Sequence, residues 1–206
     1  MTQNKNINLL IIILGLFVLC GCSGNDQYTE LARRELATGV RKDSLFLGFK
    51  LGMTKKEFYG RAWELNKEHV VKNGGRNMSV EYHFDDLKKP AVMNFYPTFY
   101  ENKIYQMPVV VKYDAWAPWN RNLYADSLQQ DLLRLFKKWY GKDFIKVHDK
   151  KKGLIYIKVD GNRSIAILQE NDMYVDVLFT DLITQKKMKE KNHPWYTFWD
   201  KFKPTL

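Results

Sequence analysis

A helical pattern followed by strand-like runs occurs twice in this chain, and that order restricts the possible folds more than any other feature. Apolar residues recur at helical spacing over residues 54–71 and again over 122–140. After each stretch come short strand-like runs, and the first of them, at residues 80–84, alternates apolar with polar residues as half-buried strands do. The runs are residues 80–84, 92–99 and 104–113 after the first helix, and 144–147, 154–159, 165–168 and 173–179 after the second. The pattern predicts an α+β protein in which each helix covers one face of an antiparallel sheet.

Two helix-then-meander units follow from this pattern, at residues 45–115 and 116–182. A tether with a short helix precedes them within residues 22–44, and a basic aromatic tail follows at 183–206. The units share little residue identity, so the repeat is one of architecture. Two separate sheets and one continuous sheet both fit the pattern.

Local motifs mark the boundaries of several expected elements. Thr54 and Glu57 form a capping-box pattern at the start of the first long helix. The pair Asp160-Gly161 is typical of a tight hairpin turn between two strands. Pro108 has no N–H to donate, so it predicts a sheet edge or a bulge in its strand.

Three further segments carry weaker local patterns. Residues 29–37 predict a modest helix that Gly39 ends. Residues 45–49 are apolar and predict a short strand or an extended segment. His69 lies on the apolar stripe near the end of the first long helix, where it suits the edge of the core or a helix C-terminus.

The N-terminal region is typical of a secretory signal. Residues 7–19 form an apolar run of 13 residues after a polar, basic start, and this is shorter than the ~20 residues that span a bilayer as a helix. The next residues, Leu19-Cys20-Gly21-Cys22, resemble the lipobox of bacterial lipoproteins, which implies diacylglycerol on Cys22 and cleavage before it. Cys20 is the rival acceptor, but Leu19 is too large for the cleavage position. An uncleaved anchor or an ordinary secretory signal is the alternative.

Export changes the partners that the charge suggests. Loss of the signal peptide 1–21 removes Lys5 and lowers the net charge from +10 to +9. A basic protein in the cytoplasm would suggest nucleic acid, whereas a lipid-anchored protein of the cell envelope, at the outer membrane, meets anionic lipid, acidic glycan or a protein partner. The alternative is that the charge only keeps the surface soluble. The mature chain keeps no free thiol, so cysteine catalysis and a disulfide are both excluded.

One segment resembles known envelope proteins. Residues 43–54, DSLFLGFKLGMT, followed by Glu57-Phe58 and WELN at 63–66, resemble the opening of uncharacterised lipoproteins of gut-type bacteria. The Gly-Met-Thr-x-x-Glu start is also similar to small lipoproteins of the barrel-assembly accessory kind, and the doubled unit resembles the β-lactamase-inhibitor protein fold. These resemblances imply an envelope address and an α+β fold, and they carry no functional residue to this chain.

A row of polar residues offers the one candidate metal site. Glu81, His83 and Asp85 occupy alternate positions of a predicted strand, so their side chains share one face. Such a row can supply metal ligands. The alternative is the polar outer face of a half-buried strand, and on balance we expect neither a metal nor a cofactor. The sequence contains no catalytic motif that we recognise. An enzyme whose site is built from scattered acidic residues stays an alternative.

Two tryptophans in the connector between the units are the main candidate binding residues. Trp116 and Trp119 flank Pro118, and such rings stack on sugars or anchor a protein partner. The alternative is that they close the core between the units.

The C-terminal tail carries a second aromatic cluster. Trp195, Phe198, Trp199 and Phe202 follow Pro194 at the spacing of one helix face, with lysines around them. This suits a membrane interface, and docking on the protein's own body is the alternative.

The sequence predicts a non-catalytic, lipid-anchored envelope protein that acts as a protein-binding or complex-accessory module. An envelope glycan or acidic polymer is the alternative ligand, and a metal-dependent enzyme is the less favoured one. Asp43-Ser44-Leu45 also resembles a three-residue O-glycosylation site, with Ser44 as acceptor.

Overall fold

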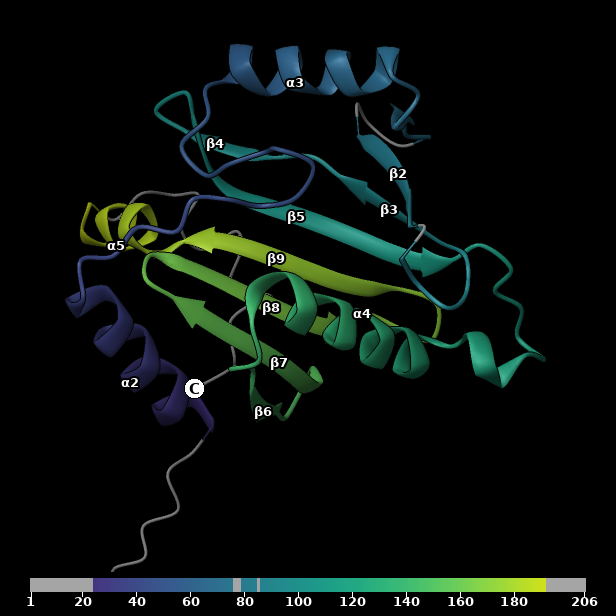
Figure 1. The fold of residues 1–206 in the computed structure, drawn as a ribbon. Coiled ribbons are helices and arrows are strands. Elements are labelled where there is room, and N and C mark those ends of the chain that lie inside the picture. The colour runs from purple at the N-terminus through teal and green to yellow at the C-terminus, as the bar shows by residue number, and fades with distance from the viewer. Residues whose placement is uncertain (1–23, 76–78, 85, 192–206) are drawn as a thin grey trace, which may run out of the picture.

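The computed structural model describes residues 24–75, 79–84 and 86–191 of the chain. They form an antiparallel sheet with helices on both faces (Figure 1). The helices are α2 (Gly24–Ala37), α3 (Lys55–Lys67), the 3₁₀ turn η1 (Arg121–Leu123), α4 (Ala125–Tyr140) and α5 (Leu182–Glu190). The strands are β1 (Val71–Asn73), β2 (Val80–Phe84), β3 (Ala91–Phe95), β4 (Thr98–Tyr100), β5 (Lys103–Tyr113), β6 (Ile145–Asp149), β7 (Gly153–Asp160), β8 (Arg163–Gln169) and β9 (Val175–Asp181).

The two predicted units share one continuous sheet. Its strand order is β1-β2-β3-β5-β9-β8-β7-β6, and β4 also pairs with β5. The units join where β5 pairs with β9, from Gln106 opposite Thr180 to Val111 opposite Val175. The α+β class is therefore confirmed, and the continuous sheet is the arrangement that the protein adopts.

The capping box at the start of α3 is confirmed. The Glu57 N–H donates to the Thr54 hydroxyl at 3.3 Å, and the Thr54 N–H donates to the Glu57 carboxylate at 2.7 Å. These two bonds satisfy N–H groups that the first helical turn leaves without partners. Phe58 and Leu65 then point from α3 into the core.

The predicted end of this helix is wrong. The helix stops at Lys67 rather than near residue 71, because the Val70 N–H donates to the Leu65 carbonyl at 2.9 Å and the His69 N–H to the Asn66 carbonyl at 3.0 Å. This pair of bonds is a Schellman motif, which needs a left-handed residue. His69 occupies that position with φ 57 and is exposed, so it is not part of the apolar stripe.

The prediction for Pro108 is wrong about the sheet edge, since β5 is a central strand with neighbours on both sides. The irregularity lies in the neighbouring chain instead. The predicted run at 92–99 divides into β3, which pairs with β5 from Val109 onward, and β4, which pairs with β5 up to Gln106. Pro108 therefore lies opposite the interval between the two short strands.

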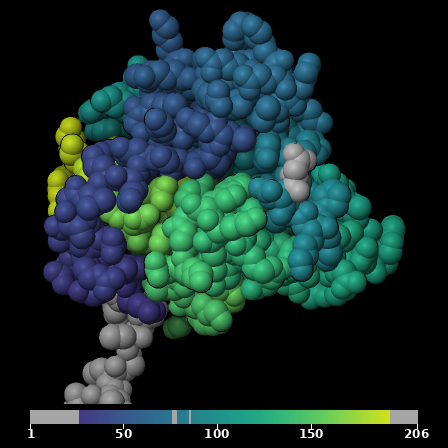
Figure 2. Space-filling view, viewed as in Figure 1, coloured from purple at the N-terminus to yellow at the C-terminus, as the bar shows by residue number. Residues whose placement is uncertain are grey.

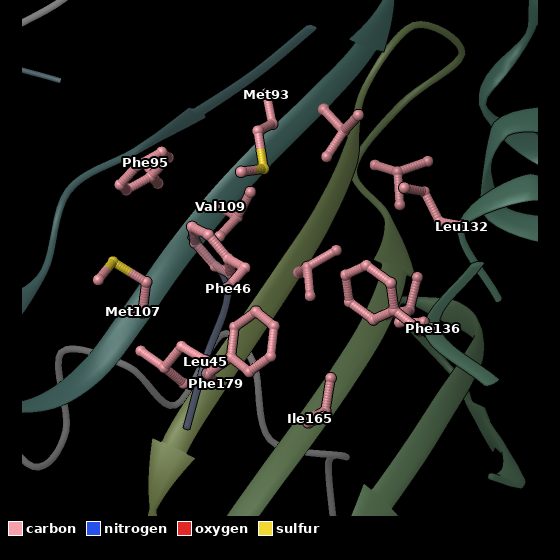
Figure 3. Close-up of a cluster of buried hydrophobic side chains, with 14 of the residues drawn as sticks. Leu45, Phe46, Met93, Phe95, Met107, Val109, Leu132, Phe136, Ile165 and Phe179 are labelled. Carbon is pink, nitrogen blue, oxygen red and sulfur yellow. The ribbon is translucent and has the colours of Figure 1, made fainter. Parts of the chain in front are cut away.

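Residues 45–49 form a tight loop, so the prediction of a strand there is wrong. Leu47 and Gly48 have φ values of 52 and 82, which turn the chain back on itself, and the Leu45 N–H then donates to the Phe49 carbonyl at 2.9 Å. The loop places the Phe46 ring between the two halves of the sheet (Figure 3). Its centroid lies 4.9 Å from that of Phe95 on β3 and 5.5 Å from that of Phe179 on β9.

The opposite face of the second unit has its own cover. Ile165 and Ile167 of β8 belong to the core beneath α4, whereas the alternate residues Ala166 and Leu168 pack with α2. Because successive strand residues point to opposite faces, α2 and α4 lie on opposite sides of the sheet. The predicted tight turn at Asp160-Gly161 is confirmed, since β7 and β8 pair directly across Gly161 and Asn162.

Candidate functional site

The connector between β5 and α4 holds one of its tryptophans in place. The indole Nε1 of Trp116 donates to the Asp172 carbonyl at 3.2 Å, which ties the connector to the turn before β9. The Trp116 ring also lies 6.0 Å from the Tyr124 ring, centroid to centroid. Trp116 is half-buried and engaged within the fold, in keeping with the closing role that was the alternative for this residue.

Trp119, three residues further on, is 87% exposed. Its backbone surroundings are nevertheless fixed. The Asn120 N–H donates to the Ala117 carbonyl at 2.9 Å, and the Tyr124 hydroxyl donates to the Pro118 carbonyl at 2.6 Å. The connector thus presents a large apolar ring to solvent from a loop that hydrogen bonds hold in shape.

Charged side chains brace the end of the connector that leads into α4. The Lys89 ammonium donates to the Asn122 carbonyl at 2.5 Å. The Arg121 guanidinium lies over the Tyr124 ring at 4.3 Å and contacts the Asp126 carboxylate at 3.4 Å. Arg121 follows Trp119 by two positions in the sequence, and its guanidinium is engaged with Tyr124 and Asp126 rather than with the exposed ring.

The polar row on β2 forms an ion-pair chain. The Glu81 carboxylate contacts the Lys72 ammonium at 3.0 Å and His83 Nε2 at 3.1 Å, while His83 Nδ1 lies 3.5 Å from the Asp114 carboxylate. Partial burial opposes ionisation of Glu81, but the bonds from Lys72 and His83 outweigh it and lower the pKa of this carboxyl. Both nitrogens of the imidazole and the Glu81 carboxylate already have protein partners.

The metal prediction therefore gains no support from the geometry. Asp85 lies outside the described residues, so its place beside Glu81 and His83 is untested. Within the described ranges, no group of three or more histidine, cysteine, aspartate or glutamate side chains is arranged to hold a metal ion.

Other predicted sites fall outside the described residues. These are the acylation site Cys22 and the aromatic tail residues Trp195, Phe198, Trp199 and Phe202. Ser44 is described and exposed, but its O-glycosylation stays a prediction. Between residues 24 and 191, apart from the gaps at 76–78 and 85, no helix is long and apolar enough to cross a membrane.

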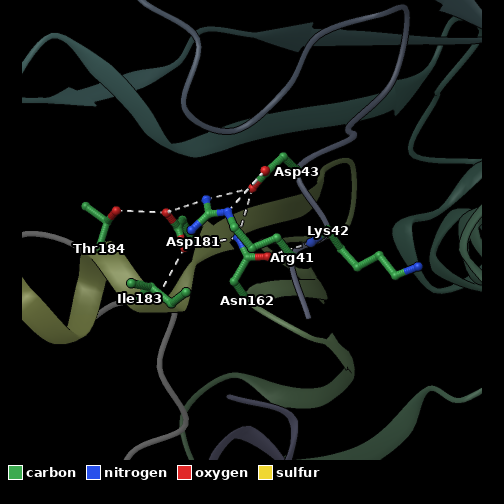
Figure 4. A network of polar contacts seen from close by, with 7 residues as sticks. All are labelled: Arg41, Lys42, Asp43, Asn162, Asp181, Ile183 and Thr184. Atoms are coloured by element: carbon green, nitrogen blue, oxygen red, sulfur yellow. Dashed lines mark hydrogen bonds and ion pairs between the residues drawn. The ribbon is translucent and has the colours of Figure 1, made fainter. Parts of the chain in front are cut away.

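A polar network that the sequence analysis missed ties three distant segments together (Figure 4). The Asn162 side chain accepts from the Lys42 N–H at 2.6 Å and donates to the carboxylates of Asp43 at 3.1 Å and Asp181 at 3.2 Å. Asn162 has no exposed surface, although it follows the Asp160-Gly161 turn signal. That signal indicates a surface turn, and only the packing of residues 40–44 over it explains the burial.

A second exposed aromatic pair was also missed. Tyr59 and Trp63 lie four residues apart on α3 and are 46% and 63% exposed. Their spacing opposite Phe58 and Leu65 is the signal that could have revealed them. Trp63 differs from Trp119 because the Lys67 ammonium covers its ring at 4.4 Å.

Comparison with known proteins identifies no relative of this chain. No family model matches the chain, and neither a curated protein nor a solved structure does.

Proposed function

We propose that this protein is a non-catalytic, lipid-anchored envelope protein that binds a partner protein through the connector around Trp119. The observation that carries the proposal is the 87% exposure of this ring on a braced loop. Tryptophans that insert into a partner's pocket are among the few residues that dominate binding, at about 2 kcal/mol or more each. A solvated tryptophan held ready for contact is therefore better explained by a partner than by stability.

The rigidity of the connector supports binding in a second way. Association costs free energy for every side chain and loop that it must order. Here the bonds of Trp116, Tyr124 and Lys89 order the loop before any partner arrives. Most of the binding free energy of Trp119 is then available for affinity.

The position of the connector suits a tethered protein. The proposed lipid site Cys22 precedes the first residue of α2 by only two positions in the sequence. Figure 1 shows α2 and the connector at opposite sides of the molecule. An anchor so near to α2 in the sequence would hold the membrane on the side of the molecule away from the connector, which favours a protein partner over insertion into the same membrane.

The polar residues of β2 do not favour a catalytic function over this proposal. Glu81 and His83, which the sequence offered for metal chemistry, are engaged with each other and with Lys72 and Asp114. The Trp119 ring, in contrast, is exposed to solvent.

Mild crosslinking in cells followed by purification of the full-length protein tests the proposal. We expect one stoichiometric protein partner, and we expect Trp119→Ala to reduce its recovery at least tenfold. Trp63→Ala is the matched control, because it removes another exposed tryptophan from a different surface. Recovery that Trp119→Ala leaves unchanged would contradict the proposed interface.

The anchor needs its own measurement. Mass spectrometry of the mature N-terminal peptide should show diacylglycerol on Cys22, and Cys22→Ser should release the protein from the membrane fraction. An unmodified Cys22 in membrane-bound protein would contradict the lipid anchor and leave the Trp119 interface to be judged by the crosslinking result.

A further inference from the structure

An open cleft lies between the two units on the face that carries α4. Its volume is about 580 Å³, and its lining comes from the segment 42–47, from β2 and β3, from the end of α4 and from the β7–β8 turn. Figure 2 shows this face, where the segment (violet-blue) meets α4 (green). Clefts of this size between structural units commonly hold small molecules or single sugar residues.

Aromatic rings form one wall of this cleft. Trp139, near the end of α4, is 37% exposed although its ring stacks on Phe136 at a centroid distance of 5.7 Å and an angle of 22°. Tyr82 of β2 is half-buried and also lines the cleft. Packing fixes these rings while they remain open to the cleft. Fixed aromatic faces are suited to the apolar C–H face of a pyranose ring as well as to flat aromatic ligands.

A buried guanidinium that is paired with a carboxylate also lines the cleft. Arg163 is 5% exposed and donates to the Ser44 carbonyl and, at 3.0 Å, to the Asp160 carboxylate. It also lies over the Tyr140 ring at 4.8 Å, and its Nε has no hydrogen-bond partner among the described residues. The ion pair with Asp160 offsets the charge of Arg163, so the attraction of an anion to this cleft depends on a further cation.

A second cation stands at the rim. The backbone N–H of Lys42 is bonded to Asn162, but Figure 4 shows its side chain extending away from that network. Within the described part of the chain, its ammonium forms no ion pair. With Asp160 as the acid among the lining residues, Lys42 and Arg163 leave the cleft with a net positive charge.

Polar groups that suit hydroxyls complete the lining. One oxygen of the Asp160 carboxylate accepts from Arg163, while the other has no partner in the ranges that the structure describes. Ser44, an exposed residue with a hydroxyl side chain, belongs to the same lining. An acceptor and a hydroxyl beside an aromatic wall are what a polyhydroxylated ring requires, and a purely aromatic anion would leave them unused.

We propose that this cleft binds an acidic sugar, with the pyranose ring against Trp139 and Tyr82 and its carboxylate at Lys42. The site is separate from Trp116 and Trp119, where the sequence suggested a glycan, and it does not depend on the proposed protein partner. The chemical class is a hexuronate, free or at the end of an envelope polysaccharide.

Titration of the full-length protein in detergent with D-glucuronate, followed by tryptophan fluorescence and calorimetry, tests the proposal. We expect saturable binding of glucuronate and binding of neutral glucose at least fivefold weaker. Lys42→Gln should reduce glucuronate affinity at least fivefold without weakening glucose, since it removes charge from an exposed side chain. Trp139→Ala should weaken both sugars. Trp119→Ala and Lys150→Gln are the controls and should leave both affinities unchanged.

Three results would overturn the proposal. They are no saturable signal with glucuronate, equal glucuronate affinity in Lys42→Gln, and binding of benzoate as tight as that of glucuronate. The last would show that the cleft takes an aromatic anion rather than a sugar. If Trp139→Ala proves unstable, the Lys42→Gln comparison still decides the question. A polysaccharide with a terminal uronate distinguishes the two sources of the ligand. Competition with free glucuronate would show that the cleft accepts the end of a polymer, and lack of competition would restrict the ligand to the free sugar.

Discussion

The side-chain amide of Asn162 donates to the carboxylate of Asp43 at 3.1 Å, across 119 positions of sequence. The same amide group also bonds Lys42 and Asp181. The β7–β8 turn is thereby fixed to the segment that crosses the sheet and to the start of α5.

Replacement of Asn162 should therefore destabilise the whole fold. Asn162→Ala removes the acceptor of the Lys42 backbone N–H and one of the donors to the buried Asp181 carboxylate, so we expect a loss of about 2–3 kcal/mol in the free energy of unfolding. Urea denaturation measures this. Asn73→Ala, at an exposed strand position, should change stability by less than about 0.5 kcal/mol. Equal effects of the two variants would contradict the role of the network.

Two glycines should respond to alanine in opposite directions. Gly161 has φ 57, and a Cβ there would lie 2.3 Å from the Val40 carbonyl oxygen, so Gly161→Ala should cost about 1–3 kcal/mol. Gly60 lies within α3 with no atom within 4 Å of an added Cβ, so Gly60→Ala should stabilise by about 1 kcal/mol. Thermal unfolding of both variants checks the signs, and a stabilised Gly161→Ala would refute the close approach.

The left-handed residue after α3 offers a stabilising substitution. His69 adopts φ 57, which costs a residue with a Cβ about 1 kcal/mol relative to glycine. His69→Gly should therefore raise the free energy of unfolding by up to about 1 kcal/mol. His148→Gly, within β6, should lower it instead, because glycine weakens a strand. A destabilised His69→Gly would mean that the imidazole makes a contribution greater than the backbone strain.

Stability should fall at alkaline pH partly because of Tyr113. Burial raises the pKa of its hydroxyl from 10.0 to about 12, and that hydroxyl donates to the Asp131 carboxylate at 2.7 Å. The folded state then binds the proton more tightly than the unfolded state, so stability is lost as pH rises from about 10 to 12. Tyr113→Phe should lower stability near neutral pH and flatten the decline above pH 10.

Urea titrations at several pH values test this difference. Tyr174→Phe, at a half-buried tyrosine before β9, controls for the loss of a hydroxyl. A decline of the same slope in wild type and Tyr113→Phe would assign the alkaline transition to other groups.

The two connector tryptophans should separate stability from binding. Trp116→Ala loses the bond to Asp172 and the contact with Tyr124, so we expect a cost of about 1–2 kcal/mol. Trp119→Ala should stay within about 0.5 kcal/mol of wild type, since the ring is exposed. Calorimetric melting of the two variants measures the contrast. A large loss of stability in Trp119→Ala would argue against a surface kept free for a partner.

Features that depend on neighbouring residues were predictable. The Thr54–Glu57 capping box, the α4 periodicity and the β7–β8 turn each rest on interactions within a few positions. The end of α3 was not predictable, because the Schellman bonds around His69 and the pairing of β1 with β2 end the helix before the apolar pattern over residues 54–71 does.

The candidate site divides in the same way. The aromatic composition of the connector identified Trp116 and Trp119 as candidates. Only the structure shows that Trp116 bonds to Asp172 within the fold, whereas Trp119 is exposed. The cleft has no sequence signature at all, since Lys42, Tyr82, Trp139 and Arg163 come from four separate segments.

Local patterning thus decided the elements, their order and the α+β class, because backbone bonding and amphipathic spacing act over short distances. Tertiary structure decided that β5 pairs with β9 and that the loop at 45–49 places Phe46 across the join. It also buried Asn162 beneath residues 40–44. Such contacts form between residues far apart in the chain. Local patterns allow several arrangements of the same elements, and close packing together with the need to pair buried polar groups selects one of them.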